Sequence, residues 1–135
     1  MTSALNLTPV NTVLLALTYL VIKHWIADFV LQTDSQRHQK AIYGAAGGLK
    51  HALIHVGLTA PVFLILTAVP PITILMLLAG EFAVHYHIDW AKEKLVRDRH
   101  LTVTDREFWW TIGFDQMLHG LTYIAIVWIA VHDAL

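Results

Sequence analysis

Long apolar stretches constrain this chain more than any other feature. Four stretches, at about residues 9–31, 49–69, 71–92 and 105–131, each approach the roughly 20 residues that a helix needs to cross about 30 Å of hydrocarbon. Only 14% of the residues are charged, against about 25% in ordinary soluble domains. The sequence therefore predicts an all-α, four-helix transmembrane bundle that forms a single domain over residues 1–135. A soluble four-helix bundle is the alternative, and the length and apolarity of the stretches disfavour it.

Capping residues and prolines indicate where these helices begin and end. Thr8 followed by Pro9 has the pattern of an N-cap and a first helical residue. The two prolines at 70–71 end the second stretch and start the third, and Thr104 and Glu107 have capping-box spacing before the fourth. Short connections between antiparallel neighbours predict up-down topology.

The connection after the first stretch carries signals of its own. Thr33 and Gln36 have capping-box spacing and predict a short helix along the membrane surface. The glycines between positions 44 and 48 are expected to separate this segment from the second stretch. Pro61 is expected to kink the second helix, because proline cannot donate a hydrogen bond to the Gly57 carbonyl.

Basic residues indicate the orientation of the bundle. All nine Lys and Arg fall in or near the two connections that an up-down bundle places on one side of the membrane. By the positive-inside rule this side is cytoplasmic, so both termini are expected outside, and the expected location is a bacterial inner membrane. The basic residues are Lys23, Arg37, Lys40, Lys50, Lys92, Lys94, Arg97, Arg99 and Arg106.

Ionisable residues occur as pairs at i, i+4 spacing on all four stretches. Residues at this spacing share one face of a helix. At 1.5 Å per residue, every pair falls within roughly 3–16 Å of the cytoplasmic boundary, so an antiparallel bundle would bring the pairs together. Charged groups inside a bilayer are costly and mark functional sites. The pairs are His24/Asp28, His51/His55, His85/Asp89 and Asp115/His119, and Glu81 lies four residues before His85.

These residue types predict a metal centre. Imidazole and carboxylate are ligands of Zn, Mn and Fe, and paired His and carboxylate groups on facing helices build metal sites in bundles. One or two such ions per chain are expected, with Glu81 or Asp115 as general base. The alternative is a polar network that only holds helices together, at about 0.6–2 kcal/mol per bond. The expected ligands are His24, Asp28, His51, His55, His85, Asp89 and His119.

Neighbouring polar residues are expected to support the ligands. Gln32 and Gln116 are expected to hydrogen-bond to them. Lys92 is expected to support the site and to reach phosphate head groups. Lys23 is expected to face lipid or a partner carboxylate. The histidines expected at the surface are His38, His100 and His132.

The chain resembles a family of small bacterial and phage integral-membrane proteins of undefined function. The resemblance implies a membrane protein in which the matching residues form the site, and it implies no activity or substrate. His55 and Glu81 have no counterpart in the family pattern and rest on spacing alone. The matching pieces are HWIADFVLQT at 24–33, KHAL at 50–53, HYHIDWAK at 85–92 and DQMLH at 115–119.

The favoured function is a membrane-embedded, metal-dependent hydrolase that acts on a lipid-like or phosphorylated substrate at the cytoplasmic leaflet. A bound metal lowers the pKa of a water molecule and polarises a carbonyl or phosphoryl group. Basic residues at the same boundary would attract anionic head groups. These residues are Lys50, Lys92, Lys94, Arg97 and Arg99.

Two other functions stay open. A transporter or channel component would use the same ligands as a transit site for a divalent cation or proton, although the apolar outer halves of the helices disfavour a path through one monomer. A small, metal-stabilised interaction protein is the third, and a homo-oligomer is compatible with each. A net charge of −1 provides no field for nucleic acid, and the chain has no cysteine for thiolate ligation. Residues 1–11 lack the basic region of a cleaved signal peptide.

Overall fold

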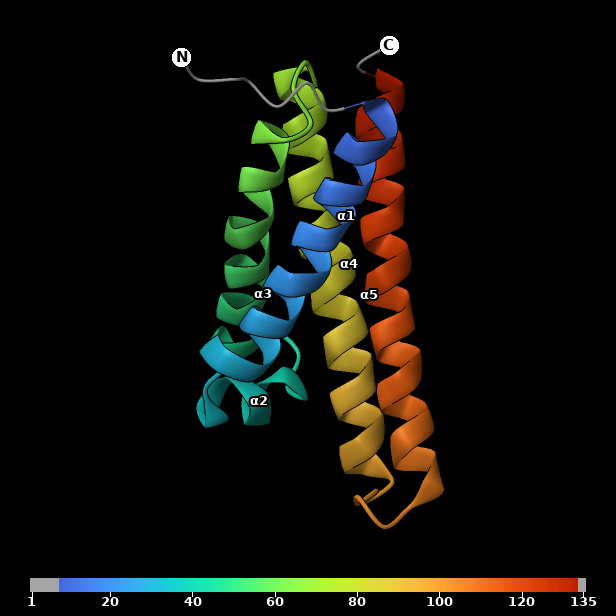
Figure 1. Cartoon of the computed structure of the whole chain (residues 1–135). Coiled ribbons are helices and arrows are strands. Elements are labelled where there is room, and N and C mark those ends of the chain that lie inside the picture. The colour runs from blue at the N-terminus through green and yellow to red at the C-terminus, as the bar shows by residue number, and fades with distance from the viewer. Residues whose placement is uncertain (1–7, 134–135) are drawn as a thin grey trace.

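The computed structural model describes residues 8–133, which form helices and no strand. Figure 1 shows long helices packed side by side, with the short α2 at one end of α1 and α3. The predicted all-α class is confirmed. The α-helices are α1 (Pro9–Trp25), α2 (Asp34–Lys40), α3 (Ala46–Thr59), α4 (Pro71–Asp98) and α5 (Arg106–Asp133); the π-helix η1 (Ile26–Leu31) follows α1, and the 3-10 helix η2 (Ala60–Leu64) follows α3.

The first helix begins as predicted and changes its winding near its end. The Thr8 side chain accepts a hydrogen bond from the Asn11 N–H at 3.3 Å, and Pro9 is the first helical residue. The last six residues of the predicted first stretch form the π-helix η1, which contains Asp28. Single π turns are rare and occur often at functional sites.

The predicted short helix after the first stretch is confirmed as α2. Its capping box is complete, because Thr33 Oγ1 accepts from the Gln36 N–H and Gln36 Oε1 accepts from the Thr33 N–H. The next helix, α3, begins at Ala46, earlier than the predicted position near 49. Gly47 lies inside α3, where a Cβ atom would come within 2.8 Å of the Gln39 side chain. This glycine therefore allows α3 to approach α2 closely and does not break the helix.

The prediction of one continuous helix over 49–69 is wrong. α3 ends at Thr59, η2 continues to Leu64, and turns and irregular backbone follow to Pro70. Pro61 lies at the start of η2, where its missing N–H is compatible with the change of winding. Three helical segments of the described residues are long and apolar enough to cross a membrane, namely Pro9–Leu31, Pro71–Asp98 and Arg106–Asp133.

The two long helices α4 and α5 pack against each other along their length (Figure 1). α4 runs past its predicted end near 92 to Asp98. In the connection to α5, the Asp105 carboxylate accepts the Thr102 N–H at 2.6 Å, and the Thr104 hydroxyl lies 2.7 Å from the Thr102 hydroxyl. α5 then starts at Arg106.

Many large apolar side chains of this chain are exposed and several histidines are buried, the reverse of the usual pattern in soluble proteins. Large apolar side chains such as Phe29, Leu64 and Trp128 are 68–81% exposed, and wide exposed apolar surfaces mark contact with membranes or partners. Fully buried side chains include His51 and His55. An apolar core occupies the end of the bundle where α1 begins and α5 ends (Figure 1). This core contains Ala16, Leu20, Val62, Leu66, Val69, Leu77, Tyr123, Ile126, Val127 and Ala130.

Candidate metal centre

The structure brings all four predicted pairs into one cluster. The residues come from α1 with η1, from α3, from α4 and from α5. The histidine rings form a connected set, with centroids 3.8 Å apart for His55 and His85 and 4.2 Å apart for His85 and His119. Asp28 is half-buried and the other cluster members are buried. The cluster consists of His24, Asp28, His51, His55, His85, Asp89, Asp115 and His119.

Asp28 lies beside three histidines, as many as Asp89 does. Its Oδ1 lies 3.0 Å from His51 Nε2 and 3.1 Å from His55 Nε2, and its Oδ2 lies 3.2 Å from His24 Nε2. Donor atoms of Asp28, His51, His55 and His85 all lie within 4.8 Å of one another. Asp28 of η1, His51 and His55 of α3, and His85 of α4 therefore form the first candidate set.

A second candidate set lies next to the first, between α4 and α5. His119 Nε2 is 3.4 Å from Asp89 Oδ1 and 3.6 Å from Asp115 Oδ1. Asp89 Oδ2 lies 3.3 Å from His85 Nε2 and 3.4 Å from His51 Nε2. Asp89 thus joins the two sets through its two oxygens.

His24 is held by a residue that the sequence analysis did not identify. Its Nδ1 lies 2.9 Å from the Tyr123 hydroxyl, and its ring is 4.8 Å from the His119 ring. A partner on one imidazole nitrogen fixes the ring and directs the other nitrogen toward a ligand site. Tyr123 follows His119 by four residues, so the same spacing rule could have found it.

The geometry of the cluster fits a divalent ion. Two ligand atoms about 2.1 Å from one ion, at right or tetrahedral angles, are about 3.0–3.4 Å apart. His51 Nε2 lies 3.0 Å from Asp28 Oδ1, yet this nitrogen has no hydrogen-bond partner among the described residues. The buried atoms His85 Nε2 and Asp115 Oδ1 also have no hydrogen-bond partner among the described residues. Buried polar atoms are normally satisfied, and a shared cation would satisfy these.

Glu81 lies outside both sets. Its Oε1 accepts from Lys23 Nζ at 2.8 Å and from Thr59 Oγ1 at 2.8 Å, and its Oε2 is buried without a hydrogen-bond partner among the described residues. Lys23 Nζ also donates to the His55 carbonyl at 3.1 Å. Lys23 was expected to face either lipid or a partner carboxylate, and the structure pairs it with the carboxylate of Glu81. The role of Glu81 as general base stays a prediction.

Lys40 is a buried cation beside the cluster, and the sequence analysis did not assign it to the site. Its side chain is 4% exposed, and its Nζ lies 2.8 Å from Asp89 Oδ2 and 4.0 Å from Asp28 Oδ1. It ends α2, which the sequence analysis placed along the membrane surface. No periodic pattern marks this residue, because its position depends on how α2 docks against α3 and α4.

The three supporting residues lie beside the ligands in different ways. Gln116 Nε2 donates to Asp115 Oδ2 at 3.0 Å. Gln32 Nε2 donates to the Asp28 carbonyl at 3.1 Å, while Lys92 Nζ pairs with Glu93 at 2.5 Å. The three histidines expected at the surface, His38, His100 and His132, are exposed.

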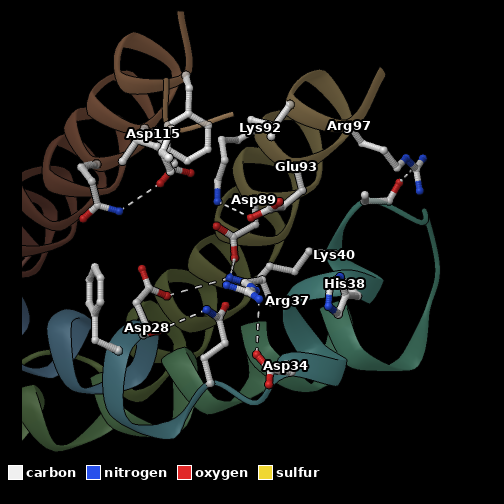
Figure 2. A pocket seen from close by; sticks show the side chains of 18 of the residues that line it. Asp28, Asp34, Arg37, His38, Lys40, Asp89, Lys92, Glu93, Arg97 and Asp115 are labelled. Carbon is white, nitrogen blue, oxygen red and sulfur yellow. Dashed lines mark hydrogen bonds and ion pairs between the residues drawn. The ribbon is translucent and has the colours of Figure 1, made fainter. Parts of the chain in front are cut away.

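A half-open cavity of about 740 Å³ leads from the surface to the cluster. Figure 2 shows Asp28, Asp89 and Asp115 approaching its inner end from three helices, with Lys40 and Lys92 beside them. The wall also carries apolar side chains from η1 and α5. Carboxylates of both candidate sets therefore face a space that a substrate can reach.

Fold and site together define an all-α protein with membrane-length helices and a buried histidine–aspartate cluster that could hold a metal ion. The chain belongs to the family described as "Protein of unknown function (DUF3307)", whose model matches residues 16–135. This assignment agrees with the resemblance to an uncharacterised family. No curated protein and no solved structure matches the chain.

Proposed function

We propose that the protein is a membrane-embedded, metal-dependent hydrolase that acts on a lipid-like or phosphorylated substrate at the cytoplasmic leaflet. One observation carries the proposal: carboxylates of the buried cluster, Asp28, Asp89 and Asp115, also line the open cavity. A structural ion would need no such access, whereas a catalytic ion keeps an open position for water and substrate.

The proposed topology is an up-down four-helix transmembrane bundle in a bacterial or phage-encoded inner-membrane protein. The segments α1–η1, α3–η2, α4 and α5 would cross, with both termini outside. Figure 1 supports this arrangement, since α1 begins and α5 ends at one end of the bundle, opposite to α2 and the α4–α5 connection. Basic residues such as Arg37, Arg97 and Arg99 lie on or next to these two segments, as the positive-inside rule requires.

The proposed cofactor is one or two ions of Zn, Mn or Fe. The first would bind Asp28, His51, His55 and His85, and the second Asp89, Asp115 and His119. Histidine nitrogens and carboxylate oxygens suit these metals. His24, with its Tyr123 contact, lies between the two sets and belongs to a third group with His85 and His119.

When only the first set holds an ion, Asp115 is not a ligand and is the better placed of the two candidate bases; when a second ion is bound, Asp115 is its ligand. It lines the cavity and its Oδ2 accepts from Gln116, whereas Glu81 pairs with Lys23 deeper in the bundle. A bound metal supplies an activated water and polarises the substrate. A carboxylate at the cavity wall can take the proton of that water as it attacks a carbonyl or phosphoryl centre.

Transport of a cation or proton is the weaker candidate. The polar groups continue inward from the cluster to Glu81 and Lys23, then meet the apolar core around Leu20 and Val62. A carrier needs access from both sides, and this core covers the second side. A metal-stabilised interaction protein would not need the cavity.

The topology can be tested with reporter fusions. A reporter that is active only outside the cytoplasm should give signal when fused to the C-terminus and none when inserted between Arg97 and Thr102, since basic connections are retained inside. The reverse pattern would overturn the orientation and place the cavity on the outer face.

The cofactor can be tested by elemental analysis of detergent-purified protein. We expect one or two transition-metal ions per chain, with retention lost at acid pH because ligand histidines must be neutral. The exposed-histidine variants His38→Ala and His132→Ala should retain the metal. A folded, metal-free protein whose melting temperature does not respond to Zn, Mn, Fe or Co would refute the metal centre.

A further inference from the structure

The charge of the cavity depends on whether a metal is bound. Five carboxylates and four Lys or Arg side chains line it, which gives a formal charge of −1. One dication would change this to +1 and two to +3. Without metal the cavity therefore repels an anion, and with metal it attracts one, because charges act strongly in clefts with low-dielectric walls.

Lys40 lies where metal binding would change the charge of the cavity. Its ammonium lies 2.8 Å from Asp89 Oδ2 (Figure 2). The same oxygen lies 3.3 Å from His85 Nε2 and 3.4 Å from His51 Nε2. A metal ion on these nitrogens would lie close to the same oxygen. The positive charges of this ion and of the Lys40 ammonium repel each other, so metal binding is expected to weaken the contact between Lys40 and Asp89.

The backbone of Lys40 is packed against α3. A Cβ atom on Gly48 of α3 would lie 3.5 Å from the Lys40 Cα, so α2 contacts α3 directly at this point. The flexible side chain is the part that can turn away from Asp89. Because Lys40 lines the cavity, its ammonium then faces the cavity next to the metal.

We propose that Lys40 is the anion-binding residue of the metal centre and that it holds the phosphate group of a phosphate monoester against the metal. This inference rests on the proposed metal-dependent function and specifies its substrate class. Arg37 from α2 and Lys92 from α4 approach the same cavity from other directions. Several cations around one cavity suit a phosphate monoester, which carries about −1.5 to −2 charge and three strong acceptor oxygens. The apolar side chains Phe29 and Trp109 offer a wall for the rest of the molecule.

The test measures phosphate and metal affinity in the same variants of the full chain in detergent. Inorganic phosphate is titrated calorimetrically into metal-loaded and metal-stripped wild-type protein, Lys40→Met and Lys40→Arg. Lys50→Met is the matched control. The sequence analysis counted Lys50 among the residues that attract head groups, but the structure places it as an exposed lysine of α3 outside the cavity. A second arm adds phosphatidic acid in phosphatidylcholine nanodiscs as competitor, which separates a lipid phosphate from a soluble one.

Lys40→Met is expected to lower phosphate affinity without lowering metal affinity. Lys40→Met should weaken phosphate binding at least tenfold and bind metal as tightly as wild type or tighter, since it removes a competing cation. Lys40→Arg should keep most phosphate affinity, and Lys50→Met should change neither. A positioning role for Lys40 would move both affinities downward together. Metal binding with unchanged phosphate affinity in Lys40→Met overturns this inference alone, while absence of metal binding overturns the proposed function as well.

Discussion

Replacing Asp28 with asparagine is expected to remove the metal ion of the first set while the fold survives. Asp28 contacts His24 of α1 and both His51 and His55 of α3, so its loss removes the anionic ligand on which these two helices converge. We expect metal affinity to fall by more than about 100-fold, beyond the 10–100-fold typical of residues that only orient ligands. Asparagine keeps the size and an oxygen acceptor and removes only the charge.

The matched control for this substitution is Asp34→Asn. Asp34 is an exposed aspartate of α2, with Arg37 at 3.4 Å as its ion-pair partner. The Asp34→Asn variant should retain metal at the wild-type level. Elemental analysis measures the metal, and circular dichroism checks the fold. If Asp28→Asn retains as much metal as the wild type, the first set is a hydrogen-bond network that holds helices together and does not bind metal.

Lys23→Met is expected to cost about 3–5 kcal/mol of unfolding free energy, because it leaves Glu81 charged and buried without its partner. Lys23 is 3% exposed and Glu81 is 2% exposed, with 2.8 Å between Nζ and Oε1. The double variant Lys23→Met/Glu81→Met should recover most of the loss, since an apolar pair of similar volume can replace a buried ion pair. Equilibrium unfolding in detergent micelles measures both.

A surface ion pair provides the control for this experiment. Lys94 and Asp98 are paired on α4 and their side chains are 46% exposed, so Lys94→Met should cost less than about 1 kcal/mol. Equal losses of unfolding free energy in Lys23→Met and Lys94→Met would contradict the buried pair.

The double variant Lys23→Met/Glu81→Met also separates the two roles of Glu81. If hydrolysis returns with stability, Glu81 is structural; if stability returns and hydrolysis does not, Glu81 is the general base.

The i, i+4 rule could predict which residues the helices bring together because it depends only on helix geometry. It placed His24 with Asp28 and His85 with Asp89, and both pairs meet at 3.2–3.3 Å. Extended by one turn, it would also have reached Tyr123 from His119. Hydropathy likewise indicated the membrane-length segments.

Features that depend on tertiary contacts could not be predicted in this way. Lys40 enters the cluster because α2 docks against α3, with Gly47 allowing the close approach to Gln39. The end of α3 at Thr59 was missed because hydropathy continues through the turns that follow Pro61. A pattern of apolar residues records burial in lipid and carries little information on whether the backbone stays helical.

The π-helix η1 carries the ligand Asp28 in its wide turn. A π turn accommodates one residue more than an α turn, so six residues in π winding rotate the chain by about as much as five residues in an α-helix. Removing a single residue from Ile26–Leu31 would therefore allow this segment to rewind as α-helix while the following helix, Asp34–Lys40, keeps nearly its present rotation. The change would fall on Asp28, whose approach to His51 and His55 depends on the wide turn. A one-residue deletion in η1 is thus expected to disturb the metal ligand and to leave the orientation of Lys40 nearly intact.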